Sequence, residues 1–147
     1  MEKNNSVILA PYANSVDLLD FEFWENLSIR LLDKGYKVFT NVSKDSEKAI
    51  LGTDPIMFHI EIAQLILKEA GYFVGLRSGF CDVVCNAECK KIILYPNTVF
   101  DIGDVYDTSS FEKMGIGKNM YEIKCKWGGD NYNYAELMEK VVKLIAG

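Results

Sequence analysis

Long apolar runs, basic clusters and histidine are scarce in this sequence of 147 residues. No apolar stretch approaches the ~18 residues of a membrane-spanning helix, so we expect no membrane span. The longest basic run is Lys90-Lys91 and the net charge is −5. A nucleic-acid partner requires a concentrated basic surface, and we therefore expect none. His59 is the one side chain whose ordinary pKa lies near neutral pH.

The polar start of the sequence, Met1 to Asn5, lacks the apolar region of an export signal. With four cysteines and no such signal, we expect a cytoplasmic protein with reduced thiols. Hydrophobic residues make up 49% and charged residues 25%, which excludes a disordered or coiled-coil chain. The length predicts one domain, residues 1–147, that buries well over half of its unfolded surface.

Short apolar runs alternate with segments of helical periodicity. The apolar runs predict six strands, at residues 7–10, 36–41, 49–51, 72–74, 92–95 and 121–127. The third run is short, and the alternative for it is a loop. Helices are predicted at residues 20–34, 55–70, 78–88 and 134–146. Gly35 and Gly71 follow two of these helices, where a left-handed residue is favoured, and Asp54 and Asn133 precede two others as caps.

This alternation predicts a Rossmann-like α/β fold, a three-layer α/β/α domain around a mostly parallel sheet of about six strands. The continuously apolar strands fit a sheet that is covered on both faces. A Rossmann-like strand order would make the first and fourth strands neighbours. Ligands of such sheets bind beyond the carboxyl ends of the strands, near the point where the strand order reverses. The candidate ligand-binding loops are residues 11–15, 52–58, 75–79 and 96–99.

The turn after the fourth strand has the composition of a phosphate-binding loop. Gly75 and Gly79 allow close approach of the backbone, Ser78 adds a hydroxyl, and Arg77 adds a fork suited to phosphate. A diphosphate site is therefore one interpretation. The alternative is a tight turn in which Ser78 caps the next helix and Arg77 is solvated.

Two further segments contain candidate binding residues. Asn14 and Ser15 follow the first strand and could complete a phosphate or sugar site, or could belong to a plain polar loop. The glycine fingerprint of dinucleotide binding is missing there, so we expect no NAD or FAD and no other cofactor. On the second predicted helix, His59 is either a general base or a structural or exposed residue. Glu61 either accepts hydrogen bonds from ribose or lies on the surface.

Three cysteines recur at intervals of four residues, at Cys81, Cys85 and Cys89. This spacing predicts one helical face packed on the sheet. Zinc sites usually take cysteines at closer spacing from loops, so we expect no metal. Side chains four residues apart on a helix run side by side, so we also expect no disulfide among these three.

Four segments carry a more specific pattern. They are Gly52-Thr53, Ile60–Ile66, Tyr72–Gly79 and Ile92–Thr98. In this order they resemble the carboxyl-terminal half of GT-B glycosyltransferases, in particular the heptosyltransferase-like group. That half has a Gly-x-Thr segment, a helix reading roughly Leu-x-Glu-Leu-Ala-x-Leu-Ile, a strand ending Phe-Val-Gly-Asn-Asp-Ser-Gly and a later strand ending near Pro-Thr. With the opening strand, loop and helix, the resemblance covers about two thirds of the chain.

The resemblance implies a nucleotide-sugar or nucleoside diphosphate as ligand. Carried over by position, Ser78 and Gly79 would hold the diphosphate, Asn14 or Ser15 would contact phosphate, and Glu61 would lie near the ribose. Two departures stand out. Leu76-Arg77 replaces the usual Asn-Asp pair, and 147 residues leave no room for the second, acceptor-binding domain of a complete GT-B enzyme.

The sequence therefore leads to a hypothesis with two alternatives. The hypothesis is the donor-binding half of a metal-independent glycosyltransferase, inactive alone, in which the helix start at Ser78 and the guanidinium of Arg77 stabilise the leaving nucleotide diphosphate. One alternative is a non-enzymatic module that binds a nucleotide or phosphate ligand. The other is a small stand-alone enzyme of nucleotide metabolism on a flavodoxin-like sheet.

Overall fold

The fold was analysed in a computed structural model, which describes residues 1–14, 16–96, 99–100, 103–104, 106, 110–125, 127–128 and 131–147. Its centre is a six-stranded sheet in the order β3-β2-β1-β4-β5-β8. Every pairing within this sheet is parallel. The strands are β1 (Ser6–Ala10), β2 (Lys37–Asn41), β3 (Asp54–Ile56), β4 (Gly71–Leu76), β5 (Lys90–Tyr95) and β8 (Met120–Lys124).

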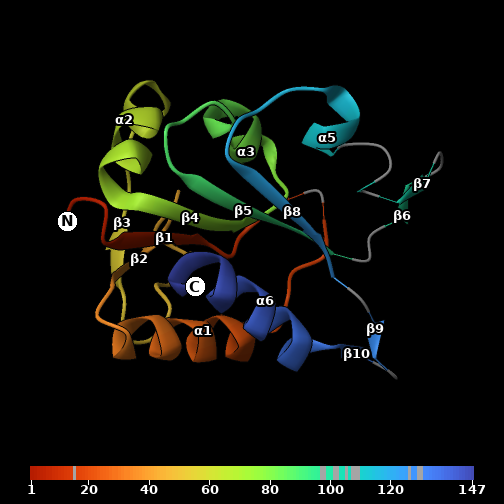
Figure 1. The fold of residues 1–147 in the computed structure, drawn as a ribbon, viewed down its shortest axis with the longest axis horizontal. Helices are drawn as coiled ribbons and strands as arrows, with labels where there is room; N and C mark the ends of the chain where they lie inside the picture. Colours follow the sequence, from red (N-terminus) through yellow and green to blue (C-terminus); the bar gives the residue numbers. More distant parts are fainter. Residues whose placement is uncertain are drawn as a thin grey trace.

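Helices cover both faces of this sheet (Figure 1). On one face lie α1 (Phe21–Asp33) and α6 (Tyr134–Ala146). On the other lie α2 (Ile60–Ala70), α3 (Gly79–Val84) and the short α5 (Phe111–Met114). Two small antiparallel pairs complete the described elements: β6 (Val99–Phe100) with β7 (Gly103–Asp104), and β9 (Trp127–Gly128) with β10 (Asn131–Tyr132). The predicted three-layer α/β fold with a parallel sheet is confirmed.

The strand order also confirms that the first and fourth strands are neighbours. Ala10, the last residue of β1, lies opposite Gly75 in β4. On one side of this pair the sheet continues to β2 and β3, and on the other to β5 and β8. The strand order reverses between β1 and β4, and a parallel α/β sheet binds its ligands beyond the carboxyl ends of the strands at such a point.

Three predicted helix ends are confirmed by their backbone geometry. Gly35 and Gly71 have φ of 93° and 101°, in the left-handed region that glycine enters without steric cost. The side chain of Asn133 accepts a hydrogen bond of 3.2 Å from the backbone N–H of Glu136, which caps the start of α6.

The third strand and the second helix were predicted wrongly. The strand is Asp54–Ile56 rather than residues 49–51, and the helix begins at Ile60 rather than at Pro55. Residues 50–53 form a turn, because Thr53 N–H bonds to Ile50 O and Ile50 N–H bonds to the Thr40 hydroxyl. β3 lies at the edge of the sheet, where the missing N–H of Pro55 is tolerated.

Two other predicted elements are shorter in the structure. β8 ends at Lys124 rather than at residue 127, and α3 ends at Val84 rather than at residue 88. α3 ends in a tight turn, in which Ala87 N–H bonds to Val84 O at 2.9 Å and Cys89 N–H bonds to Ala87 O at 2.9 Å. The buried ammonium of Lys91 donates to the carbonyls of Ala87 and Cys89 and closes this turn.

The core has two parts, one on each face of the sheet. Cys81, Cys85 and Cys89 pack into the part that includes α2 and α3, and Cys125 packs into the other. All four are buried free thiols in this structure. Because α3 ends at Val84, Cys89 follows the helix and does not share its face with Cys81. None of the helices described is both long and apolar enough to cross a membrane.

Candidate functional site

A hollow of about 410 Å³ lies where the strand order reverses. Three loops build it, each at the carboxyl end of a strand: the loop after β1, the loop after β2 and the turn between β4 and α3. We call it the switch-point hollow. Its lining residues are Ala10, Tyr12, Ala13, Asn14, Asn41, Ser43, Glu47, Ser78, Gly79 and Phe80.

Three of the predicted binding residues lie together in this hollow. Ser78 precedes α3 in extended conformation and Gly79 is the first residue of the helix. A Cβ built on Gly79 would meet no atom within 4 Å, so the glycine leaves open space. Helix geometry leaves the N–H of Gly79 without an intrahelical partner. Asn14 faces the same hollow from the loop after β1.

The other predicted residues lie elsewhere. Gly75 is buried within β4, where a Cβ would come within 2.7 Å of Phe73 Cζ, so its place in the fold reflects strand packing. Glu61 is exposed on the first turn of α2 and is not among the hollow's lining residues. Ser15 lies outside the described residues.

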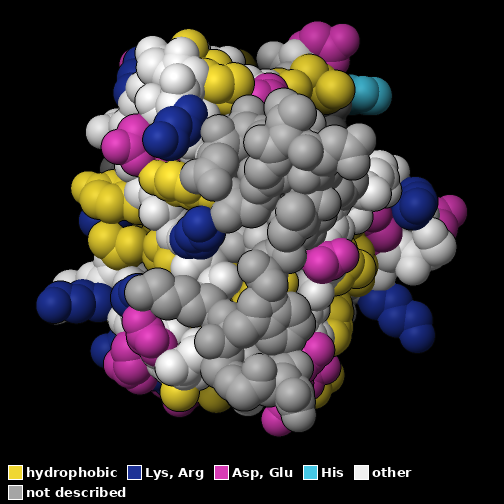
Figure 2. Space-filling view, turned by 90° about the vertical axis from the view of Figure 1, so that its right-hand side faces the viewer, with side chains coloured by type: hydrophobic (Ala, Val, Ile, Leu, Met, Phe, Trp, Pro, Cys, Tyr) yellow, Lys and Arg dark blue, Asp and Glu magenta, His cyan; other side chains and the backbone are white. Residues whose placement is uncertain are grey.

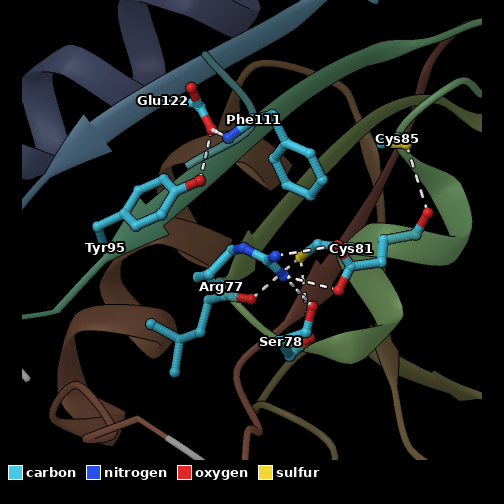
Figure 3. Close-up of polar contacts among 9 residues, drawn as sticks. Arg77, Ser78, Cys81, Cys85, Tyr95, Phe111 and Glu122 are labelled. Atoms are coloured by element: carbon cyan, nitrogen blue, oxygen red, sulfur yellow. Dashed lines mark hydrogen bonds and ion pairs between the residues drawn. The ribbon is translucent and has the colours of Figure 1, made fainter. Parts of the chain in front are cut away.

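Arg77 is not among the residues that line the switch-point hollow. Its side chain is only 9% exposed and forms an ion pair of 2.9 Å with Asp82. The guanidinium also lies over the ring of Phe111, 4.5 Å from the ring centroid. Figure 3 shows the Arg77 side chain between Phe111 and Ser78. The alternative of a solvated arginine is therefore wrong.

The loop after β2 contributes residues that were not predicted from the sequence. Glu47 accepts hydrogen bonds from Ser43, at 2.7 Å from the backbone N–H and 3.0 Å from the hydroxyl. Tyr12 donates to the carbonyl of Lys48 at 2.5 Å and so ties this loop to the loop after β1. Burial raises the pKa of Tyr12, and the nearby carboxylate of Glu47 adds to this effect. A signal was available, because an acidic residue after β2 often binds ribose in Rossmann folds.

The charge of the hollow is unusual for a phosphate site. Glu47 is an acid, and no lysine or arginine is among the lining residues described. Hydrogen bonds to a bound diphosphate would come from neutral donors such as the Ser78 hydroxyl, the Asn14 amide and the Gly79 N–H. Among the described residues, no group of three or more His, Cys, Asp or Glu side chains could hold a metal ion.

A second hollow, of about 480 Å³, adjoins the first and shares Asn41, Ser43 and Phe80 with it. We call it the apolar hollow. Its remaining lining residues are Val42, Met57, Phe58, His59 and Ile60. The rings of Phe58 and Phe80 lie 5.9 Å apart. Figure 2 views the molecule from this end and shows hydrophobic side chains beside the single histidine, His59.

His59 lies beside the apolar hollow, at the residue before α2 and not within the helix. It is the exposed residue that precedes the helix, and its side chain makes no capping hydrogen bond. Because His59 lines a hollow, its side chain can contact a ligand bound there. Among the contacts described, none joins His59 to an acidic or basic side chain. The structure therefore does not single it out as a general base.

Comparison with known proteins finds similarity in structure only. No protein-family model and no curated protein sequence matches the chain. The E. coli heptosyltransferase WaaC with ADP matches with a TM-score of 0.69 and 15% identity, over 98% of this chain and 45% of that one. E. coli ADP-heptose heptosyltransferase II matches with 0.70 and 14%, over 98% and 47%. WaaC with ADP-2-deoxy-2-fluoro heptose gives 0.66 and 15%, over 97% and 43%.

The chain therefore has a heptosyltransferase-like fold and spans less than half the length of these enzymes. The resemblance identified from the sequence is confirmed at the level of fold. At identities of 14–15% the comparison shows the fold alone and transfers no residue role.

Proposed function

We propose that this chain binds a nucleoside diphosphate, free or as part of a nucleotide-sugar, and corresponds to the donor-binding half of a two-domain glycosyltransferase. The observation that carries the proposal is the position of the switch-point hollow. It lies at the reversal of strand order, in a fold whose solved neighbours include one with ADP and one with an ADP-sugar analogue.

The phosphates would lie against the turn between β4 and α3. Ser78 and Gly79 offer a hydroxyl, a backbone N–H and, because Gly79 has no side chain, room for close approach. Asn14 offers an amide from the opposite loop. Ser15 follows it in the chain, and we retain it as a candidate phosphate contact.

The nucleoside would extend from there toward β2 and β3. Glu47 lies in the switch-point hollow, where its carboxylate can accept hydrogen bonds from the two ribose hydroxyls. We therefore prefer Glu47 to the exposed Glu61 for this role. The apolar hollow beyond it, with Phe58 and Phe80, suits a flat aromatic base.

Binding by neutral donors is expected to be weak. Charge-assisted hydrogen bonds are roughly twice as strong as neutral ones, and the described lining has no cation. In the proposed enzyme a second domain would add contacts and hold the acceptor. For this chain alone we expect dissociation constants of about 0.1–1 mM for nucleoside diphosphates, or roughly −4 to −5.5 kcal/mol.

Calorimetric titration with ADP, UDP, GDP and CDP tests the proposal. Asn14→Asp places a negative charge in the switch-point hollow and is expected to weaken diphosphate binding by about tenfold or more, through repulsion. Asn26→Asp is the matched control, because Asn26 is also exposed and lines a separate hollow between α1 and α6. No measurable binding, or equal loss in both variants, would contradict the proposal.

A further inference from the structure

Arg77 makes three kinds of contact at the turn that bears Ser78 and Gly79 (Figure 3). Its guanidinium forms two hydrogen bonds with Asp82, of 2.9 and 3.1 Å, in the geometry of a fork. Nη1 also donates to the carbonyl of Ser78 at 2.6 Å. The third contact is the stacking on Phe111. Together these contacts leave Arg77 only 8% exposed.

The hydrogen bond to Ser78 O has a consequence for the hollow. The Ser78 carbonyl and the Gly79 N–H belong to one planar trans peptide, in which the C=O and N–H bonds point in opposite directions. Arg77 Nη1 and the backbone N–H of Cys81 both donate to this carbonyl, at 2.6 and 3.0 Å, and Arg77 is not among the residues that line the switch-point hollow. The orientation of the Gly79 N–H is fixed by the same contacts.

Phe111, on which the guanidinium rests, is itself held by a carboxylate. Glu122 in β8 accepts hydrogen bonds from the backbone N–H of Phe111 at 2.7 Å and from that of Glu112 at 3.0 Å. The hydroxyl of Tyr95 in β5 donates to the same carboxylate. Phe111 is 1% exposed. Arg77 is therefore packed against an element that is tied to two strands of the sheet.

We infer that Arg77 is a positioning residue, which orients the Ser78–Gly79 peptide so that its N–H faces the ligand without touching the ligand itself. The effect of Arg77 on ligand binding rests on the proposed function. The planar fork of arginine suits this role, because one guanidinium donates to the Asp82 carboxylate and the Ser78 carbonyl at once. A lysine ammonium at this position keeps the charge and loses the fork.

Two measurements on Arg77→Lys and Arg77→Met test this role. The first is made without ligand: the residual dipolar coupling of the Gly79 N–H in the ¹⁵N-labelled chain, which reports the direction of that bond. The second is the dissociation constant for ADP, measured well below the melting temperature of each variant, so that lost stability does not lower the folded fraction. Arg30→Met is the matched control, because Arg30 forms its ion pair with Glu139 between α1 and α6.

Both Arg77 variants are expected to change the Gly79 coupling and to weaken ADP binding about tenfold, while folded spectra are retained. Arg30→Met is expected to change neither. An unchanged Gly79 coupling in both Arg77 variants would overturn the positioning role, whatever the wild-type chain binds. If the wild-type chain bound no nucleoside diphosphate, the proposed function would fail, and a changed coupling would still support the orientation of the peptide by Arg77.

Discussion

Gly75 in β4 and Ala10 in β1 face each other so closely that a Cβ on Gly75 would lie 3.0 Å from the Cβ of Ala10. The same Cβ would lie 2.7 Å from Phe73 Cζ. The two strands on either side of the reversal point therefore approach each other over a glycine. Four residues later, Gly79 has open space where a side chain would be.

This contrast predicts different effects for the same substitution. Gly75→Ala is expected to lower the free energy of unfolding by about 1–3 kcal/mol, because a well-packed core has no room for a methyl group. Gly79→Ala is expected to change it by about 0.5 kcal/mol or less, but to weaken ADP binding because the methyl enters the switch-point hollow. Urea unfolding and calorimetry of both variants measure this. Strong destabilisation by Gly79→Ala would contradict the open geometry.

Glu47 and Glu61 give opposite predictions for nucleotide binding. Glu47→Gln is expected to weaken ADP binding by about 1–2 kcal/mol, because a hydrogen bond to a charged acceptor becomes a neutral one. Glu61→Gln is expected to have no effect, since Glu61 lies outside the hollow's lining. Titration with 2′,3′-dideoxy-ADP identifies the ribose contact. This ligand has no ribose hydroxyls, so we expect it to bind the wild-type chain and the Glu47→Gln variant equally. Ser43→Ala controls for the loss of the hydroxyl's hydrogen bond to Glu47, and it keeps the bond from the Ser43 backbone N–H.

Cys125 predicts a loss of stability at alkaline pH. Burial raises the pKa of its thiol from the ordinary 9.0 to about 12, against a smaller lowering effect of its hydrogen bond to Tyr95. Above pH 9 the unfolded chain releases this proton while the folded chain keeps it, so the free energy of unfolding falls as pH rises. The loss is about 1.4 kcal/mol per pH unit between the two pKa values.

The variant Cys125→Ala removes this contribution. We expect the stability difference between the wild-type chain and the variant to shrink by roughly 2.5 kcal/mol from about pH 8 to about pH 11, measured by urea unfolding under reducing conditions. A constant difference over this range would show that the thiol is not buried as described.

Periodicity and glycine position were enough to predict the layers, because strand burial and helix ends depend on local residue types. The reversal point was not readable from them and followed only from assuming a Rossmann-like strand order. The third strand was placed wrongly at residues 49–51, because the hydrogen bond from Ile50 N–H to the Thr40 hydroxyl joins different segments of the chain. The lining of the switch-point hollow was predicted only in part, because some of its residues are brought there by contacts between different segments. Ser78, Gly79 and Asn14 follow their strands directly, whereas Glu47 reaches the hollow only through the folding of its loop.

The surroundings of Arg77 could not be predicted from the sequence. An arginine between two glycines in a turn suggests a phosphate fork, and no local pattern reveals that Asp82 and Phe111 occupy it. Phe111 is 34 positions away in the sequence and reaches Arg77 because Glu122 in β8 anchors it. Long-range packing of this kind decides which polar groups remain available to a ligand.

We expect no glycosyl transfer by this chain alone. Transfer requires an acceptor hydroxyl held near the anomeric carbon with a base in reach, and proximity supplies about 7–11 kcal/mol of such barriers. We propose a nucleotide as the ligand of the switch-point hollow, and its described lining offers no separate acceptor site. Incubation with a panel of nucleotide-sugars and glycan or lipid acceptors, followed by mass spectrometry, tests this. Turnover that is lost in Ser78→Ala would show a complete enzyme.

The most direct test of the central claim is the location of nucleotide binding. In ¹H–¹⁵N spectra recorded with increasing ADP, we predict saturable shifts of the amides of residues 12–14, 41–47 and 78–80, with a dissociation constant of about 0.1–1 mM. Unchanged spectra at millimolar ADP, or shifts confined to the hollow between α1 and α6, would contradict the assignment of the switch-point hollow as a nucleotide site.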